Sequence, residues 1–415
     1  MRDGNGVVDS NSLQRGNAVE VWDERFHCRA NQGDPGVLRR AEGQRTVSDA
    51  GESDAQSKGL PNAGGPPATP HQRRPRYSGR NPRRFTDKYK ELNPERYPET
   101  VQKVFASGKT VAGTHRPVMV AEILDVLNPK PGEIAVDCTL GYGGHAREIL
   151  ARVMPGGRLI GLDADPLELP RTEERMRALG FGPESFTALR QNFAGLPRAL
   201  AEAGAAEGAD VLLADLGVSS MQLDRPERGF SMKLEGPLDM RMNPARGLSA
   251  EQLLERSKPE ELAEMLVENS EEPHAAALAR LLAGRRFATT AQLAIAVRGA
   301  LASRPAEEAA LSVRRVFQAL RIAVNDEFGA LETLLRHLPA CLRPGGRAAI
   351  LTFHSGEDRR VKRAFAEGMR SGVFSEASRE VTRAGADERR ANPRSISAKL
   401  RWVRRADSCF QNPNA

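Results

Sequence analysis

Ile134-Ala135-Val136-Asp137-Cys138-Thr139-Leu140-Gly141-Tyr142-Gly143-Gly144-His145 is the stretch that decides the fold of this chain. Its first three residues are apolar and predict a buried strand, which ends in an acid, Asp137. Three glycines follow within four positions, and the residues from His145 to Ala151 have a helical pattern. A strand, a glycine turn and a helix place backbone N–H groups at a helix N-terminus, where a ligand can approach the main chain closely. The stretch is therefore typical of a Rossmann-like sheet that binds a nucleotide-bearing cofactor.

The spacing of the glycines distinguishes between cofactors. A dinucleotide-binding turn has the pattern G-x-G-x-x-G, whereas the glycines here form G-x-G-G and Ala146 stands in place of the third glycine. The acid at the strand end, Asp137, has no role in the dinucleotide pattern. The acid and the G-x-G-G turn together resemble motif I of class I methyltransferases, which bind S-adenosylmethionine. A tight strand-to-helix turn without a ligand is the alternative that this stretch alone leaves open.

The composition of the 415 residues indicates a soluble protein of a reducing compartment. The 61 Lys and Arg residues exceed the 54 Asp and Glu residues by seven, a mild basic excess that is compatible with a nucleic-acid partner. The four cysteines lie far apart and form no C-x-x-C pair, which argues against a disulfide scaffold and a structural zinc site. No apolar run approaches the roughly 18 to 20 residues that span a bilayer. We therefore expect a cytoplasmic protein with no membrane partner and no metal.

The chain divides into four parts by its patterns. Residues 1–110 have few periodic apolar positions, and we expect a low-complexity, basic, mostly disordered extension. Its arginine-rich stretch from His71 to Lys109 includes Tyr77 and Phe85, which suits RNA contact and base stacking, with a solvated tail as the alternative. We expect the other parts to be a cofactor-binding half of the core (111–221), a helical insertion that recognises RNA or acts as a lid (222–310), and the remainder of the core with a C-terminal tail (311–415).

Two further acids and an aromatic residue end or follow predicted strands. Strands at 158–163, 186–190 and 210–215 alternate with helices, which predicts a parallel, doubly wound sheet whose ligands bind beyond the carboxyl ends of the strands. Asp137, Asp163 and Asp215 should therefore lie on one rim. Asp163 comes 19 residues after Gly144 and could accept the ribose hydroxyls of an adenosine. Phe193 could stack on the adenine or belong to the core.

The loop after Asp215 is the candidate site for a target amine. The exocyclic amine of cytosine is a poor nucleophile because its lone pair is delocalised into the ring, so an enzyme must place a hydrogen-bond acceptor on it and hold it in line. Asp215, Ser219 and Ser220 are the catalytic candidates. The tetrad Asn/Asp-Pro-Pro-Tyr/Phe of adenine-type enzymes is absent, so the loop does not itself prove an amine target.

The insertion and the segment after it have helical patterns. We expect several helices between Ala250 and Ala302 and one long helix from Leu311 to Leu338. Five arginines give the insertion a basic character that could grip RNA or form a solvated face: Arg280, Arg285, Arg286, Arg298 and Arg304.

Six segments in order resemble one family, the RsmH (MraW) family of bacterial 16S ribosomal RNA methyltransferases. They span about residues 114 to 405 and are Thr139–His145, Asp215–Ser220, Glu227–Ser231, Gly236–Met242, Phe317–Ile322, and Phe353–Ser355 with Glu357–Arg359. The resemblance implies a class I S-adenosylmethionine-dependent fold, with a Rossmann-like, mostly parallel seven-stranded sheet and an inserted helical domain. The sequence departs from the family at Tyr142, Gly356 and residues 270–274.

The resemblance also implies the chemistry. It implies methyl transfer from S-adenosyl-L-methionine to the exocyclic amine of a cytidine in the decoding region of 16S rRNA in the small ribosomal subunit. The cofactor contacts would be Gly143, Gly144, His145, Asp163, Phe193, Asp215 and Gln222. A homodimer through the insertion stays open. The rival interpretations are an NAD-type oxidoreductase on the same sheet and a non-catalytic RNA-binding assembly factor.

Overall fold

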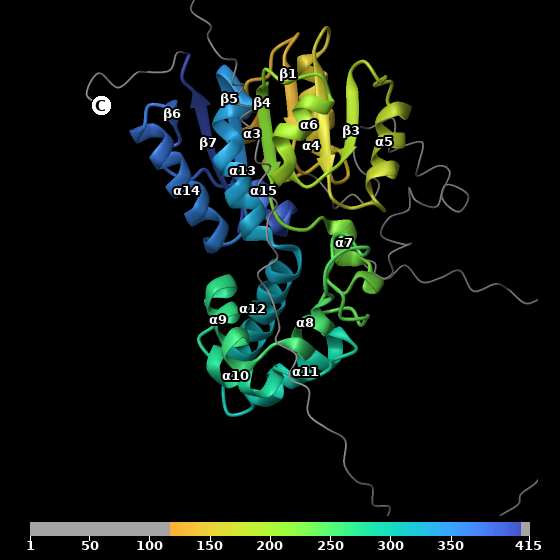
Figure 1. The fold of residues 1–415 in the computed structure, drawn as a ribbon, viewed down its shortest axis with the longest axis vertical. Helices are drawn as coiled ribbons and strands as arrows, with labels where there is room; N and C mark the ends of the chain where they lie inside the picture. Colours follow the sequence, from red (N-terminus) through yellow and green to blue (C-terminus); the bar gives the residue numbers. More distant parts are fainter. Residues whose placement is uncertain (1–116, 408–415) are drawn as a thin grey trace, which may run out of the picture. The chain divides into compact units, whose positions relative to one another are not determined.

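A seven-stranded sheet forms the centre of the structure, a computed structural model that describes residues 117–407 apart from the side chain of Ser220 (Figure 1). The strand order is β3-β2-β1-β4-β5-β7-β6. Strands β1 to β5 are parallel, and β7 runs antiparallel between β5 and β6. The expected Rossmann-like, mostly parallel sheet is therefore confirmed. The strands are β1 (Ile134–Asp137), β2 (Arg158–Asp163), β3 (Phe186–Arg190), β4 (Ala209–Asp215), β5 (Leu342–Thr352), β6 (Phe374–Ala377) and β7 (Lys399–Arg405).

Helices cover both faces of this sheet because successive strand residues point to opposite sides. Val136 and Ile350 pack with one set of helices, and their neighbours Ala135 and Leu351 pack with another. The first set is α6 (Leu196–Glu202), α13 (Glu327–Cys341) and α14 (Ser355–Arg370); the second is α3 (Val120–Leu127), α4 (Gly144–Val153) and α5 (Leu169–Ala178). Strands that are buried on both faces explain the unbroken apolar runs of the sequence.

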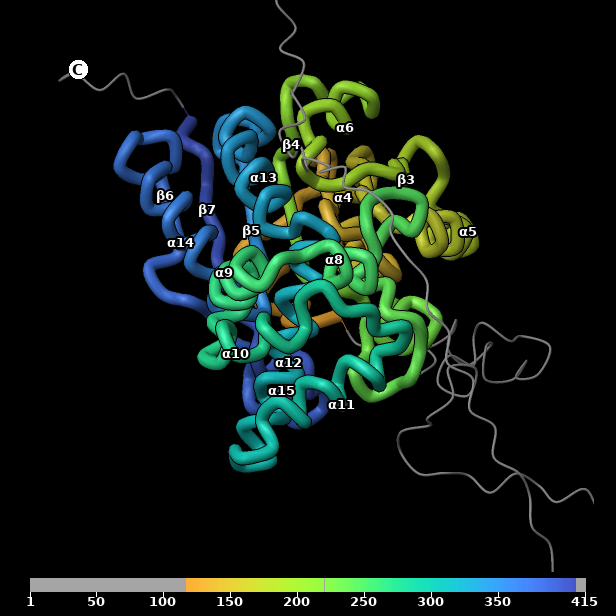
Figure 2. The backbone as a smooth tube through the Cα atoms, turned by 60° about the horizontal axis from the view of Figure 1, so that its bottom comes forward, coloured from red at the N-terminus to blue at the C-terminus, as the bar shows by residue number. Residues whose placement is uncertain are grey.

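The insertion after β4 has a hydrophobic core of its own, which extends from Phe230 to Leu320. Figures 1 and 2 show its helices gathered together beyond the strands. They are α8 (Ala250–Arg256), α9 (Pro259–Ser270), α10 (Ala275–Leu282), α11 (Thr290–Ala300) and α12 (Ala306–Asn325), preceded by the short α7 (Ser220–Asp224). The boundary that we expect at residue 310 falls inside α12.

The prediction of one helix from Leu311 to Leu338 is wrong. The chain leaves the helical conformation at Asp326, whose φ of 48° is left-handed, and α12 and α13 lie on either side of it. Just before the break, the side chain of Asn325 accepts the N–H of Met242 and donates to the carbonyl of Met240, so the end of α12 is bound to the start of the insertion. The apolar spacing continues across the break, so the sequence pattern did not reveal it.

Several predictions concern residues that the structure does not describe. The low-complexity extension 1–110, its basic stretch from His71 to Lys109, Cys28 and Cys409 lie outside residues 117–407. Within those residues, none of the helices has the length and apolar character that crossing a membrane requires. A short helix, α15 (Ala386–Ala391), lies before β7 and contacts the start of α3 through the bond from the Met119 N–H to Glu388.

Candidate active site

The glycine turn joins β1 to α4 as expected, and its backbone faces the end of β2. The N–H of Gly141 donates to Oδ2 of Asp163 over 2.9 Å. Gly143 precedes α4 with a φ of 82°, and a Cβ there would lie 3.0 Å from the side chain of Thr172. A Cβ on Gly144 would lie 2.4 Å from Pro117. Glycine is thus required at these positions by conformation and by close packing.

The three acids at the strand ends lie on one rim. Asp137 pairs in register with Gly161 on β2 and with Leu213 on β4, two residues before Asp163 and Asp215 respectively. Thr139 joins two of the acids: its N–H donates to Asp137 over 3.0 Å, and its hydroxyl accepts the N–H of Asp215 over 2.7 Å. The expectation that the acids converge is confirmed by this register.

Burial controls the charge of two of these acids. It raises the pKa of Asp137 and of Asp163 to about 6, although backbone N–H groups that donate to each carboxylate partly oppose the shift. Both carboxylates therefore change charge close to neutral pH. Asp163 accepts the N–H of Gly141 at one oxygen and the N–H of Asp165 at the other. Its oxygens lie where the glycine turn and the end of β2 meet.

His145 and Asp215 face each other inside the rim. Nε2 of His145 lies 3.4 Å from Oδ2 of Asp215, and His145 is only 7% exposed. Burial lowers the pKa of His145, but the carboxylates of Asp215 and Asp137 outweigh burial and raise it above its ordinary value. Nε2 of His145 and Oδ1 of Asp215 have no hydrogen-bond partner within the described residues. Buried polar atoms without partners fit a polar ligand at this point.

The loop after Asp215 ends in the cap of α7. Oγ of Ser219 accepts the N–H of Gln222, and the side chain of Gln222 accepts the N–H of Ser219 in return. Nε2 of Gln222 donates to Asp165 over 2.9 Å. Gln222 therefore holds the loop and the end of β2 together. Ser220 begins α7, and its side chain lies outside the described part of the chain.

Phe193 lies just after β3, in a one-turn 3-10 helix (Phe193–Gly195). Its ring is half-buried and packs against the core cluster that includes α6 and α13. The Asn192 side chain before it accepts the N–H of Ala194 and fixes this turn. The structure thus gives Phe193 a core contact and leaves part of its surface exposed.

Two ion pairs that the sequence interpretation missed tie the end of β2 to the insertion. Arg228 lies 2.7 Å from Asp165, and Arg225 lies 3.1 Å from Glu168. All four side chains are almost fully buried. Arg228 belongs to the segment Glu227–Ser231, which carries part of the family resemblance. A sequence pattern does not show, however, with which acid an arginine forms an ion pair.

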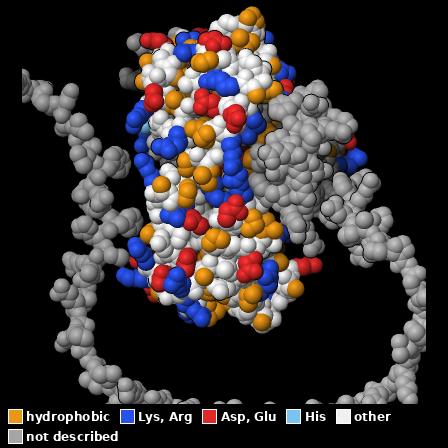
Figure 3. Space-filling view, turned by 90° about the vertical axis from the view of Figure 1, so that its right-hand side faces the viewer, with side chains coloured by type: hydrophobic (Ala, Val, Ile, Leu, Met, Phe, Trp, Pro, Cys, Tyr) orange, Lys and Arg blue, Asp and Glu red, His pale blue; other side chains and the backbone are white. Residues whose placement is uncertain are grey.

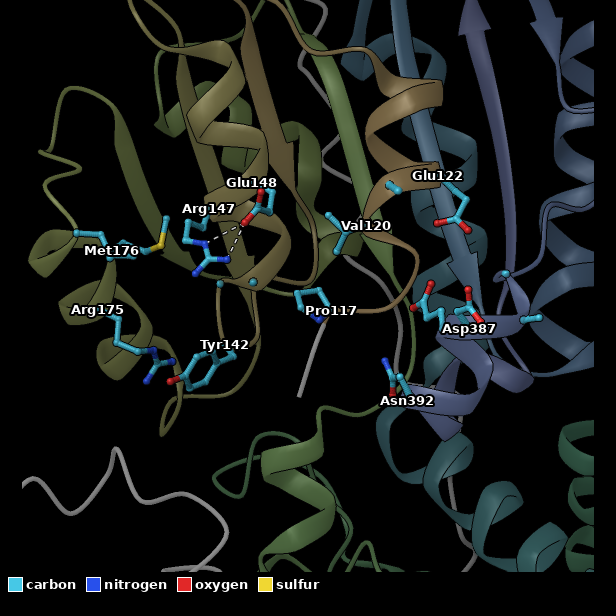
Figure 4. Close-up of a pocket in the computed structure, with 18 residues that line it drawn as sticks. Pro117, Val120, Glu122, Tyr142, Arg147, Glu148, Arg175, Met176, Asp387 and Asn392 are labelled. Atoms are coloured by element: carbon cyan, nitrogen blue, oxygen red, sulfur yellow. Dashed lines mark hydrogen bonds and ion pairs between the residues drawn. The ribbon is translucent and has the colours of Figure 1, made fainter. Parts of the chain in front are cut away.

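A cavity of about 640 Å³ lies beside the glycine turn (Figure 4). Its wall includes Tyr142, whose ring lies 3.8 Å below the guanidinium of Arg175. Asp163, Phe193 and Asp215 do not line it. Gly143 and Gly144 of the glycine turn do line it, so the cavity borders the proposed cofactor site at the turn but does not include the acids of the rim.

One group of side chains resembles a metal site. Ligand atoms of Glu327, His354 and Glu357 lie within 4.8 Å of one another. Arg321 already binds Glu327 through two hydrogen bonds of 2.8 Å, and Glu357 accepts the N–H of Phe353. The arginine supplies the positive charge that a metal would bring, so the group is explained as an ion-pair cluster at the end of β5.

Basic side chains are distributed over the surface. Figure 3, which shows the side of α5, has Lys and Arg side chains along most of the face, mixed with acidic and apolar ones. The five arginines of the insertion are all exposed, and Arg286 binds Glu251 over 2.7 Å. The insertion thus presents positive charge that is only partly paired with acids.

Comparisons with known proteins agree with this geometry. The sequence profile of the MraW methylase family matches residues 112–406. Ribosomal RNA small subunit methyltransferase H 1 of Agathobacter rectalis is 46% identical over 346 residues, which are 81% of this chain and 98% of that protein. Ribosomal RNA small subunit methyltransferase H 2 of Alkaliphilus metalliredigens is 47% identical over 344 residues, again 81% of this chain and 98% of that protein.

Proposed function

The chain belongs to the MraW methylase family, and we propose that it is an S-adenosylmethionine-dependent methyltransferase that acts on ribosomal RNA. Its target is the exocyclic amine, N4, of a cytidine in the decoding region of 16S rRNA. The observation that carries this proposal is the pair of buried His145 and partly exposed Asp215 beside the glycine turn, each with a buried polar atom that has no hydrogen-bond partner among the described residues. The names of relatives that match over nearly their whole length support the small ribosomal subunit as partner.

The residues of the rim fit the cofactor part by part. The glycine turn and His145 would hold the methionine end, the Asp163 carboxylate would accept the ribose hydroxyls, and Phe193 would flank the adenine. The full set that we propose for the cofactor is Gly143, Gly144, His145, Asp163, Phe193, Asp215 and Gln222. Of these, Gln222 would act through the loop, because its side chain is bonded to Ser219 and Asp165.

The chain's own groups would position the amine for methyl transfer. When bound, S-adenosylmethionine supplies an activated methyl group on a positively charged sulfur. Asp215 would accept a hydrogen bond from the target amine and turn its lone pair toward that methyl carbon, with Ser219 and Ser220 as the other acceptors in the loop. The proton that the amine loses on methylation would leave to Asp215 or to water.

Two other proposals would predict different ligands. An NAD-type oxidoreductase needs a pyrophosphate at the turn, but Ala146 is fully buried where that motif has its third glycine. An assembly factor without catalysis would bind RNA and leave the cofactor rim unused. The methyltransferase uses both the rim and the exposed arginines. It would act in the cytoplasm, where ribosomal subunits are assembled, as a monomer or a homodimer.

Methyl transfer to purified RNA tests the proposal. The protein would be incubated with methyl-labelled S-adenosylmethionine and either free 16S rRNA or small subunits that lack the modification. We expect label in one cytidine of the decoding region in at least one of the two substrates. Binding of S-adenosylhomocysteine without any transfer of label would rule out the enzyme, and binding of NAD instead would support the oxidoreductase.

A further inference from the structure

The turn after β2 carries two acids with different partners. Asp163 accepts the N–H of Asp165 over 2.8 Å, and Asp165 accepts the N–H of Leu167 over 2.9 Å. Asp163 faces the glycine turn, whereas the side chain of Asp165 is 1% exposed and points away from it toward the insertion. The two carboxylates therefore belong to one hydrogen-bonded turn, in which the Asp165 N–H is bound to Asp163.

Asp165 receives two donors from outside its own loop at a single oxygen. Nε2 of Gln222 donates to Oδ2 over 2.9 Å, and Nη1 of Arg228 donates to the same atom over 2.7 Å. Arg228 is 6% exposed and its Nη2 donates to the carbonyls of Arg241 and Met242. The buried guanidinium of Arg228 thus connects the carboxylate of Asp165 to the backbone of the insertion.

Gln222 extends the same network to the loop of the proposed target amine. Its Oε1 accepts the N–H of Ser219, and its own N–H is bound by the Ser219 hydroxyl. Two side chains, Asp165 and Gln222, therefore connect the acid at the end of β2 with the loop after β4. Figure 1 shows α7, which contains Gln222, between the sheet and the helices of the insertion.

We propose that Asp165 is a positioning residue that couples the cofactor site to the target-nucleotide loop and the insertion. The proposal rests on the function proposed above. Ribose hydroxyls that donate to Asp163 would fix the turn, and the turn would hold Gln222, Ser219 and Arg228 in the arrangement that receives RNA. Because coupling between two sites is reciprocal, bound RNA would also tighten cofactor binding by the same factor.

The experiment measures the factor by which RNA tightens the binding of the cofactor product. The dissociation constant of S-adenosylhomocysteine would be determined by calorimetry without RNA and with saturating small-subunit rRNA, and kcat and KM would be measured for each variant. In the unmodified protein we expect RNA to tighten binding by about 5-fold to 100-fold. Asp165→Asn should bring this ratio close to one and lower kcat about tenfold, while the dissociation constant without RNA changes less than threefold.

A second variant distinguishes a loss of coupling from a loss of stability. Asp165→Asn leaves Arg228 buried without its counter-charge, which can destabilise the whole protein. The double variant Asp165→Asn/Arg228→Gln removes both charges and retains polar side chains, and we expect it to melt near the unmodified protein but to lack the coupling. If RNA tightens the binding of S-adenosylhomocysteine in both variants as much as in the unmodified protein, the proposal is overturned.

Glu133→Gln is the matched control. Glu133 binds Arg347 over 2.7 Å in another largely buried pair, at the amino end of the strands and so away from the rim. Glu133→Gln should melt at a lower temperature, but RNA should tighten its binding of S-adenosylhomocysteine as much as in the unmodified protein. An equal loss of coupling in Glu133→Gln, or an unmodified protein that methylates without any coupling, would overturn the role of Asp165. Failure of the unmodified protein to bind S-adenosylhomocysteine would instead contradict the function proposed above.

Discussion

Nε2 of His145, at the start of α4, lies 3.4 Å from the carboxylate of Asp215, at the end of β4. The two residues are 70 positions apart in the chain, and the parallel pairing of β1 with β4 brings their elements together. Each has a buried polar atom without a hydrogen-bond partner among the described residues. The pair therefore forms a charged centre that is ready for a ligand at the rim of the sheet.

The pKa of His145 should depend on Asp215. Burial alone lowers this pKa, and the nearby carboxylates, of which Asp215 contributes most, together outweigh burial and raise it. Asp215→Asn should therefore lower the pKa of His145, which an NMR titration of the imidazole would measure. An unchanged His145 titration would show that Asp215 does not set its charge.

Stability should fall as pH rises through the titration of Asp137. Burial raises its pKa from 3.8 to about 6, so the folded chain binds a proton more tightly than the unfolded chain does. The free energy of unfolding should decrease between about pH 4 and pH 6, by roughly 3 kcal/mol for a shift of about two units. Asp137→Asn should remove this contribution and make the decrease smaller in urea titrations at several pH values, while Asp163, whose pKa is raised in the same way, keeps its own contribution. A variant with the same slope as the unmodified protein would contradict the assignment.

Cofactor affinity should depend on the charge of Asp163. Its pKa is also raised to about 6 by burial, and an ionised carboxylate is the better acceptor for two ribose hydroxyls. Binding of S-adenosylhomocysteine should weaken about tenfold per pH unit below pH 6, as measured by calorimetry. Asp163→Ala should weaken binding strongly at pH 8 and abolish the pH dependence. A dissociation constant that Asp163→Ala leaves unchanged would remove Asp163 from the ribose role.

Gly143→Ala should destabilise the protein. The φ of 82° is unfavourable for alanine by about 1–2 kcal/mol, and its Cβ would crowd Thr172 at 3.0 Å. Thermal unfolding should show a lower midpoint and calorimetry weaker cofactor binding. Gly299→Ala in α11 is the opposite case, because its Cβ meets nothing within 4 Å and alanine favours a helix. Equal melting temperatures for the two variants would refute the conformational argument.

The exposed arginines of the insertion should contribute to RNA affinity through phosphate contacts. Arg298→Gln and Arg304→Gln should each weaken RNA binding and reduce the slope of log K against log salt by about one unit. Arg286→Gln is the control, since Arg286 already binds Glu251 over 2.7 Å. Binding assays at several salt concentrations would measure the slopes. Slopes equal to that of the unmodified protein in all three variants would assign these arginines to a solvated face.

The sequence by itself determined the alternation of strands and helices from β1 to β4. Unbroken apolar runs that end in an acid predicted β1, β2 and β4, and the glycine spacing predicted the turn before α4, because these signals are local. Short or exposed elements gave no such signal: β6 (Phe374–Ala377) has two exposed residues out of four and was not predicted. The break at Asp326 was also missed, because the apolar period continues through it.

The tertiary structure alone decided which charged groups meet. His145 and Asp215, or Asp165 and Arg228, are 70 and 63 positions apart, and their distances depend on the sheet order and on the path of the insertion. Burial, which also depends on the tertiary structure, raises the pKa of Asp163 and of Asp137. It also removes Asp165 and Arg228 almost entirely from solvent. The glycine turn could be identified from local spacing, whereas the coupling between the two ends of the active site could not, because it depends on contacts between distant segments.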